Sequence, residues 1–213
     1  MPTYDACLID VFETVLSVDH LRHGAALADR AGVSTEAFTA AAGRWGPLVT
    51  DGRATLGEAL AVVLADCGVV ADDDLVASLV AADRELITEL AVLHDDSVPF
   101  LESLRAAGVR TAFVSNCAEN TRPLLEELGL SGLVDELVLS CEVGVAKPEP
   151  GIFRLALERL DVPAERAVLV DDQASYCAGA TALGLAAVRI DRRHGQGDVD
   201  TLAALTGRLT AGT

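Results

Sequence analysis

The chain has 213 residues, 51% of them hydrophobic, which is enough to bury one sizeable core or two small ones. Its 33 acidic and 16 basic residues give a formal net charge of −17, and this excess of negative charge argues against nucleic acid or an anionic membrane as a partner. The five cysteines are scattered, odd in number and free of C-x-x-C pairs, so we expect reduced thiols in packed positions rather than a disulfide framework or a zinc site.

The amino terminus carries acidic residues and no basic segment, so it does not resemble a signal peptide, and no apolar run approaches the roughly 18 residues of a membrane span. We therefore predict a cytoplasmic protein, monomeric or homodimeric, that acts on a small anionic molecule. One count is unusual: the basic residues are fifteen arginines and a single lysine, Lys147. Any chemistry that needs an ammonium group must use that position, although codon bias toward arginine would give the same count.

The first predicted element is a short apolar run from Tyr4 to Ile9, which has the length of a buried strand and ends in Asp10. At the carboxyl end of a central parallel strand, Asp10 would lie in the crevice where open α/β sheets bind ligands, as a nucleophile or a metal ligand. The alternative is a turn aspartate that simply closes the strand.

Residues 17–94 lose the strand pattern and carry apolar residues at helical spacing. Short loops between the helices indicate an antiparallel bundle. The four predicted helices run from Leu21 to Gly32, from Ser34 to a break at Gly46–Pro47, from Thr55 to Gly68, and from Asp72 to Leu86.

From His94 onward, helices alternate with short apolar strands, which is typical of βαβ units and a parallel sheet. With the first strand, this predicts a five-stranded parallel sheet in an α/β core made of residues 1–16 and 95–213, with residues 17–94 as a helical cap over the carboxyl edge. The predicted strands after the cap are Arg110 to Ser115, Glu136 to Leu139, Ala167 to Asp171 and Ala186 to Ile190. The predicted helices are Val98 to Ala107, Asn120 to Leu128, Pro150 to Leu160 and Ala174 to Leu183.

Polar residues follow three of these strands, as Asp10 follows the first. Ser115–Asn116 and Asp171–Asp172 come directly at strand ends, and Lys147 lies in the loop after the third strand. All of them should meet at one edge of the sheet. Each pair also has a structural interpretation, Ser115–Asn116 as a turn and Asp171–Asp172 as a helix N-cap, but together they supply a nucleophile, a hydroxyl, an ammonium and paired carboxylates.

With h for an apolar residue, the patterns D-x-F-x-T, hhhS-N, a lysine before proline, and hhhDD resemble the four motifs of the haloacid dehalogenase-like superfamily. The resemblance covers essentially the whole chain, including the insertion between the first two motifs, where one class of the family carries a small cap. It implies a Rossmann-like core and an aspartate that attacks phosphorus or carbon to give an aspartyl intermediate that water hydrolyses.

Carried over residue by residue, the resemblance assigns three sets of site residues. The implied catalytic residues are Asp10 as nucleophile, Thr14 supporting its loop, Ser115 holding a substrate oxygen, and Lys147 neutralising charge. The implied Mg²⁺ ligands are Asp10, the backbone carbonyl of Phe12, Asp171 and Asp172. The expected substrate-binding residues are Phe12, Asn116, Arg44 and Arg53. A divalent cation and an ammonium suit this chemistry because Asp10 and a phosphate repel each other.

The sequence departs from the family pattern at Phe12. Family phosphatases have an aspartate there that protonates the leaving oxygen and then activates water, and a phenyl ring can do neither. Haloacid dehalogenases resemble this chain in having an aromatic residue at that position, but they work without metal and lack the doubled aspartate. Glu13, where glycine is usual, is the one nearby carboxyl that could replace the acid, and a Schiff-base mechanism using a cap lysine is excluded because the cap has no lysine.

Three functions remain open. The leading one is Mg²⁺-dependent hydrolysis of a small phosphorylated metabolite; the others are 2-haloacid dehalogenation and ligand binding without turnover. His20 and His23 lie three residues apart on a predicted helix without a third metal ligand, so we expect them at the surface. Tyr176 stands where the family often has Asn or Asp, which predicts one altered contact to the site.

Overall fold

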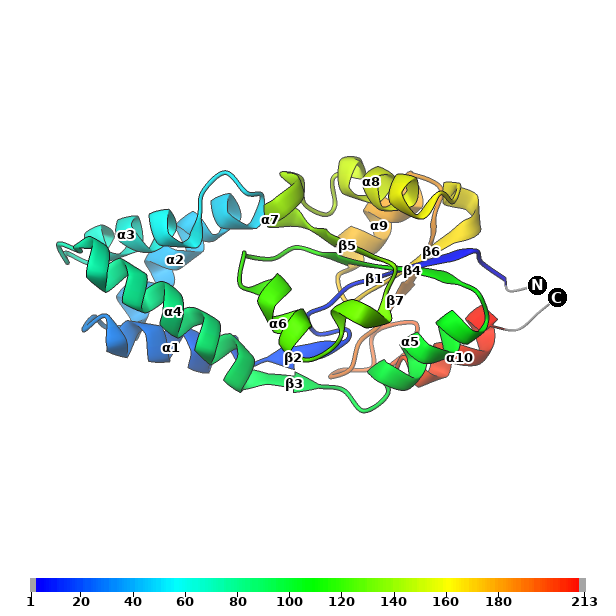
Figure 1. Ribbon diagram of the computed structural model, residues 1–213, viewed down its shortest axis with the longest axis horizontal. Coiled ribbons are helices and arrows are strands. Elements are labelled where there is room, and N and C mark those ends of the chain that lie inside the picture. The colour runs from blue at the N-terminus through cyan, green and yellow to red at the C-terminus, as the bar shows by residue number, and fades with distance from the viewer. Residues whose placement is uncertain (1–2, 211–213) are drawn as a thin grey trace.

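The computed structural model describes residues 3–210 and has a parallel sheet of order β5-β4-β1-β6-β7 at its centre (Figure 1). The strand order places β1 in the middle, between β4 and β6. The five strands are β1 (Ala6–Ile9), β4 (Arg110–Ser115), β5 (Glu136–Leu139), β6 (Ala167–Asp171) and β7 (Ala186–Arg189).

Helices cover both faces of the sheet, because alternate strand residues point to opposite sides. Cys7 and Ile9 of β1 belong to one apolar cluster, and Ala6 and Leu8 belong to the other. The first face is covered by α5 (Ser97–Ala106), α6 (Thr121–Glu127) and α10 (Ala203–Thr210). The second is covered by α8 (Pro150–Leu160) and α9 (Ala174–Ala182).

Four further helices form the cap region, which has its own apolar core around Phe38, Leu64 and Leu79. They are α1 (His20–Arg30), α2 (Thr35–Thr50), α3 (Leu56–Asp66) and α4 (Asp73–Leu90). The chain enters and leaves the cap through the antiparallel pair β2 (Leu16–Val18) and β3 (Ala91–Leu93). In Figure 1 the cap is the separate group of blue to cyan-green helices on the left.

The predicted five-stranded parallel sheet with an inserted helical cap is confirmed, and β4, β5, β6 and α8 have the predicted bounds. The predicted break at Gly46–Pro47 is wrong, because α2 continues through Pro47 to Thr50. The short elements β2, β3 and α7 (Ser140–Val143), and the 3-10 turns η1 (Ser131–Leu133) and η2 (Ala164–Arg166), were not predicted. Within residues 3–210, no helix combines the length and apolarity that crossing a membrane requires.

Candidate active site

Asp10 follows the central strand β1, and its backbone N–H donates to the Val170 carbonyl of β6 at 2.9 Å. The chain then makes a tight turn in which the amides of Val15 and Leu16 both donate to the Val11 carbonyl. Glu13 lies inside this turn with a φ of +59°, in the left-handed region that non-glycine residues seldom adopt. The turn fixes Asp10 at the carboxyl edge of the sheet, with 6% of its surface exposed.

Lys147 lies between two carboxylates at this edge. Its Nζ donates to Asp10 Oδ1 and to Asp171 Oδ2, each at 2.6 Å, and its side chain is fully buried. Burial alone lowers the pKa of a lysine, but the charges of Asp10 and Asp171 outweigh it and raise the pKa of Lys147. The only lysine of the chain is therefore a permanently charged ammonium beside the predicted nucleophile.

Three carboxylates converge on one point: Asp10, Asp171 and Asp172 each offer an oxygen, and these oxygens lie within 4.8 Å of one another. Burial and the charge of Asp10 raise the pKa of Asp171 to about 7, against the lowering effect of Lys147. The same two causes raise the pKa of Asp172. One ammonium does not balance three carboxylates, so the cluster has the donor oxygens and the unbalanced negative charge that a hard divalent cation requires.

Asn116 positions the lysine through its backbone. Its Nδ2 donates to the Lys147 carbonyl at 2.8 Å, and its Oδ1 accepts from the Lys147 N–H at 2.7 Å. Asn116 Nδ2 also lies 3.1 Å from the Tyr176 hydroxyl oxygen, and the Tyr176 ring centre is 5.0 Å from Lys147 Nζ. Tyr176 thus contacts both residues, and the aromatic face adds a cation–π interaction to the ammonium.

Two buried hydroxyls at the site, Ser115 Oγ and Thr14 Oγ1, have no hydrogen-bond partner within residues 3–210. A buried hydroxyl without a partner costs free energy, which a bound ligand oxygen would recover. Thr14 is held through its carbonyl, which accepts from Arg192 Nε at 2.9 Å. Ser115 Oγ, at the active-site end of β4, is therefore free to bind a substrate oxygen.

The residues next to the nucleophile in sequence point elsewhere. The Phe12 ring lies against the cap residue His20, with ring centroids 6.1 Å apart. The Glu13 carboxylate forms an ion pair of 2.6 Å with Arg193. Phe12 carries no acidic group, and the carboxylate of Glu13 is already engaged by an arginine.

Arg44 and Arg53, expected near the substrate, each bind a carboxylate of the cap. Arg44 pairs with Asp66 at 2.7 Å, and Arg53 pairs with Asp51 at 2.6 Å. Both guanidinium groups are mostly exposed. The structure does not bring them together with the carboxylate cluster, and a role in substrate binding stays a prediction.

His23 is not a surface residue, contrary to the sequence-based expectation. Its side chain is 15% exposed, and its Nε2 lies 3.0 Å from Oδ1 of the buried Asp83 of α4. Asn120, which precedes α6 in the core, donates from Nδ2 to the other Asp83 oxygen at 2.5 Å. The buried carboxylate therefore joins two cap helices to the core, an arrangement that depends on tertiary packing and has no local sequence signal.

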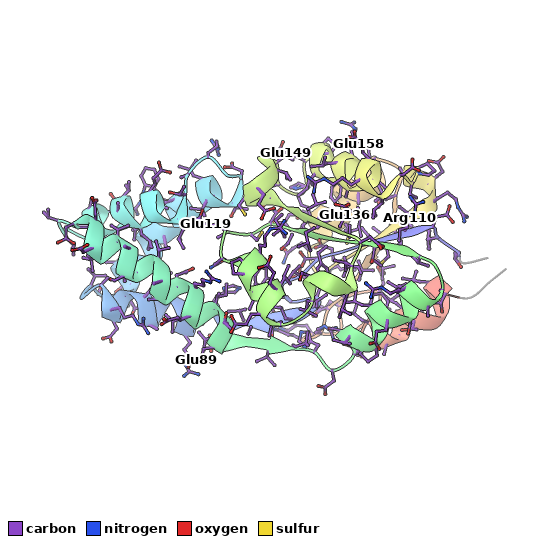
Figure 2. All side chains as sticks on the ribbon, viewed as in Figure 1. Glu89, Arg110, Glu119, Glu136, Glu149 and Glu158 are labelled. Carbon is purple, nitrogen blue, oxygen red and sulfur yellow. The ribbon has the colours of Figure 1, made fainter. Side chains whose placement is uncertain are left out.

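Two more hydrogen bonds join the cap to the core. Glu119, labelled between the two parts in Figure 2, accepts from the Leu56 amide at the start of α3 at 3.0 Å. Ser140 Oγ donates to the Thr50 carbonyl at the end of α2 at 2.5 Å. The cap rests on the loops that follow β4 and β5, on the same edge of the sheet as Asp10.

Sequence reasoning missed two positions that support the site. Gln173 donates from its amide to Asp171 Oδ1 at 2.8 Å and from Nε2 to Asp172 Oδ2 at 2.7 Å. Gly179 of α9 faces the segment after Lys147, where an added Cβ would lie 2.7 Å from the Pro148 carbonyl oxygen. A polar residue after an acidic pair gave a weak signal for Gln173, whereas nothing local distinguishes Gly179 from other glycines.

The four motifs thus meet at one sheet edge below an inserted cap. A family model for haloacid dehalogenase-like hydrolases matches residues 4–184. The chain belongs to this family. Among curated proteins, this haloacid dehalogenase-like hydrolase is 32% identical over 166 residues to (S)-2-haloacid dehalogenase 1 of Pseudomonas sp. strain CBS-3, covering 72% of this chain and 71% of that protein.

Phosphatases are similar to it as well. It is 36% identical over 135 residues to glyceraldehyde 3-phosphate phosphatase of Methanopyrus kandleri (62% of this chain, 57% of that protein). It is also 36% identical over 132 residues to ribulose-1,5-bisphosphate 5-phosphatase of Halopiger xanaduensis (54% and 55%). These stretches span only a little over half of each phosphatase.

Solved structures share the fold. A dehalogenase has a TM-score of 0.71 at 24% identity, with both chains fully covered. A HAD phosphatase from Thermococcus onnurineus has a TM-score of 0.63 at 26% identity, covering 94% of this chain and 95% of that one. The comparisons therefore establish the hydrolase family. They do not distinguish a phosphate ester from a carbon–halogen bond as the bond that is cleaved.

Proposed function

We propose that the protein is a Mg²⁺-dependent hydrolase of small phosphate esters that works through a phosphoaspartate at Asp10. The observation that carries this proposal is the convergence of Asp10, Asp171 and Asp172 around the ammonium of Lys147. A dehalogenation site that needs no metal has no use for three converging carboxylates. A phosphate site does, because its nucleophile and its substrate are both anionic.

The residues present fit Mg²⁺, which prefers carboxylate oxygens and retains water ligands. Asp10, Asp171 and Asp172 would hold it, together with the backbone carbonyl of Phe12. When bound, the ion neutralises charge on the substrate phosphate. The raised pKa of Asp171, about 7, supports the fit because an adjacent cation favours the ionised carboxylate.

In the proposed reaction, the Asp10 carboxylate attacks the phosphorus and expels the alkoxide or phenoxide leaving group. Lys147 neutralises part of the charge on the nucleophile and the transferring group, the hydroxyl of Ser115 donates to a phosphate oxygen, and Thr14 supports the loop that carries Asp10. Asn116 holds the lysine in place. Water then attacks the phosphoaspartate, releasing phosphate and regenerating Asp10.

Phe12 sets a condition on the substrate. Because no side chain at that position can protonate the leaving oxygen, the proton must come from water, and the reaction favours leaving groups that are stable as anions. We therefore propose aryl or acyl phosphates, or esters of acidic alcohols, as better substrates than simple alkyl phosphates. This proposal rests on Phe12 rather than on the cap.

The second candidate is 2-haloacid dehalogenation, which Phe12 favours. Halide leaves without a proton, so an aromatic residue two positions after Asp10 is no handicap. The relative from Pseudomonas sp. is a dehalogenase by name. In that reaction Asp10 attacks the carbon that bears the halogen, halide departs, and water hydrolyses the resulting ester.

The test is a panel of aryl phosphates, alkyl phosphates and both enantiomers of 2-chloropropionate, assayed with Mg²⁺ and with a chelator, and with Asp10→Asn as the blank. Phosphate release that requires Mg²⁺ and Asp10 supports the first function. Halide release that persists in chelator supports the second. Ligand binding without turnover of any panel member would refute both and favour a binding role.

A further inference from the structure

Two thiols that the proposed reaction does not use, Cys117 and Cys141, lie side by side just beyond the active-site ends of β4 and β5. Ser115 of β4 is paired in register with Leu139 of β5, and each cysteine comes two residues after its strand partner. Their Sγ atoms are 3.9 Å apart. Cys117 is buried and Cys141 is half-buried.

The two thiols lie in the part of the core that contacts the cap. The Cys117 amide donates to Ser140 Oγ at 2.9 Å, and that hydroxyl donates in turn to the Thr50 carbonyl of the cap. The cap loop also packs on Cys141, since a Cβ added to Gly52 would lie 2.4 Å from the Cys141 carbonyl oxygen. A change in this pair therefore acts on both the Ser115–Asn116 loop and the cap contact.

A small cavity reaches Cys141 at this junction. Its volume is about 90 Å³, and it is lined by residues of the cap and of the core: Val49, Gly52, Ala54, Thr55, Glu119 and Cys141. A water molecule needs roughly 10–15 Å³ of such space, so a peroxide can enter. Cys141 is therefore covered by the cap but reachable by a small oxidant.

We propose that Cys117 and Cys141 are an oxidation site at which hydrogen peroxide, or another small hydroperoxide, forms an intramolecular disulfide. Ser115 and Leu139, each two residues before one of the cysteines, lie on neighbouring parallel strands about 4.8 Å apart, and the two sulfur atoms already lie 3.9 Å from each other. Rotation of the two side chains must shorten the sulfur–sulfur distance to about 2.05 Å. The proposal does not depend on which substrate the enzyme hydrolyses.

The chemistry balances with peroxide as the two-electron oxidant. One of the two thiolates attacks one peroxide oxygen, giving a sulfenic acid and hydroxide, and the sulfur of the other cysteine then attacks the sulfenic sulfur and expels the second hydroxide. The two thiol protons convert the two hydroxides into water.

The other thiols provide matched controls. Cys67 lies at the end of α3 in the cap and Cys177 lies in α9, both half-buried, and burial raises the pKa of Cys177 to about 12. Neither position is at the β4–β5 junction. Replacing either by serine should leave disulfide formation between Cys117 and Cys141 unchanged.

The test is peptide mapping of the full chain after treatment with stoichiometric hydrogen peroxide, without reductant. The expected product is one peptide pair joining Cys117 to Cys141, lighter by two hydrogen atoms and restored by dithiothreitol. It should persist in Cys67→Ser and Cys177→Ser and disappear in Cys117→Ser and Cys141→Ser. The wild-type map decides the question even if a serine variant fails to fold, which circular dichroism checks.

Three results would overturn the proposal. One is a disulfide that maps to another cysteine or joins two chains. Another is either cysteine of the pair passing directly to the sulfinic acid while its neighbour stays reduced. The third is both thiols remaining alkylatable at a peroxide dose that oxidises Cys67.

Discussion

At the residue scale, the site is organised by charge balance around Lys147. One buried ammonium contacts Asp10 and Asp171 at 2.6 Å each, while Asp172 completes a cluster with net negative charge. The excess negative charge destabilises the folded protein when no cation is bound. It also favours binding of a divalent cation together with a phosphate substrate. The proposed function follows from this imbalance more than from any single side chain.

Asp10→Asn tests the nucleophile. The amide is nearly isosteric but is a poor nucleophile, so hydrolysis should fall to the uncatalysed background while circular dichroism stays unchanged. Without metal, the variant should be more stable than the wild type by about 1 kcal/mol, because one of three repelling carboxylates is gone. Thermal melts in chelator measure this gain, and substantial residual turnover would exclude covalent catalysis at Asp10.

Phe12→Asp tests the missing acid. General acid help is typically worth about 10²- to 10⁴-fold, so the variant should hydrolyse alkyl phosphates faster by up to that factor, with a smaller gain for aryl phosphates that need no proton. The gain should require Mg²⁺. Phe12→Asn is the matched control, since it removes the ring without adding an acid. A folded Phe12→Asp protein that stays inert toward both ester classes would favour dehalogenation or binding.

At the element scale, α9 positions the lysine segment through a close approach at Gly179. Gly179→Ala should displace Pro148 and with it Lys147, because the new Cβ would lie 2.7 Å from a carbonyl oxygen and 2.9 Å from the proline ring. We expect a loss of about 1–3 kcal/mol in stability and a fall in kcat. Gly207→Ala in α10, where the added Cβ meets nothing within 4 Å, should instead gain about 0.5–1 kcal/mol. Equal behaviour of the two variants would show that the contact is unimportant.

The cap is a second group of elements that acts on the site. We propose that residues 17–94 move as a lid, with the β2–β3 pair as the hinge. Thr88 of α4 and Glu127 of α6 face each other across the boundary, with side-chain oxygens 3.3 Å apart. A cleavable crosslink between Thr88→Cys and Glu127→Cys should block substrate entry, lowering turnover until the link is cut. Each single variant treated with the same reagent is the control, and unchanged turnover in the crosslinked protein would argue against a lid.

Sequence reasoning succeeded where local signals and sheet geometry agree. Strands β4, β5 and β6 each contain a run of three or four apolar residues, and parallel strands carry their terminal polar residues to one edge, so the convergence of Asp10, Lys147 and Asp171 could be predicted from the sequence. It failed at Pro47, where the helix continues to Thr50 despite the roughly 3 kcal/mol cost of a helical proline, and where Val49 in the last turn is buried. It also missed the Asp83 contacts with His23 and Asn120, because three segments distant in sequence meet there.

At the scale of the whole molecule, the net charge of −17 and the buried cluster affect stability in the same direction. Self-repulsion of the surface charge is screened by any salt, whereas the carboxylates of the site respond specifically to a divalent cation. Stability measurements can therefore separate the two contributions without any assay of activity.

The stability of the metal-free protein should depend on pH through Asp171. Burial and the charge of Asp10 raise the pKa of Asp171 from its ordinary value of 3.8 to about 7, so between these pH values the folded state holds a proton that the unfolded state has released. Raising the pH therefore favours unfolding. Without metal, the free energy of unfolding should fall by roughly a few kcal/mol as the pH rises from about 4 to 7.

Mg²⁺ should reverse this loss at pH 7.5, because it binds the ionised carboxylates of the folded state alone; at 100 times its dissociation constant, the stabilisation is about 2.7 kcal/mol. Urea titrations from pH 4.5 to 8, with Mg²⁺ or with NaCl of equal ionic strength, measure both effects. Asp171→Asn should flatten the pH profile and abolish the difference between the two salts, while Asp73→Asn, on the exposed start of α4, should change neither. If NaCl stabilises the wild type as much as Mg²⁺ does, the carboxylate cluster is no metal site, and the case for phosphate hydrolysis loses its main support.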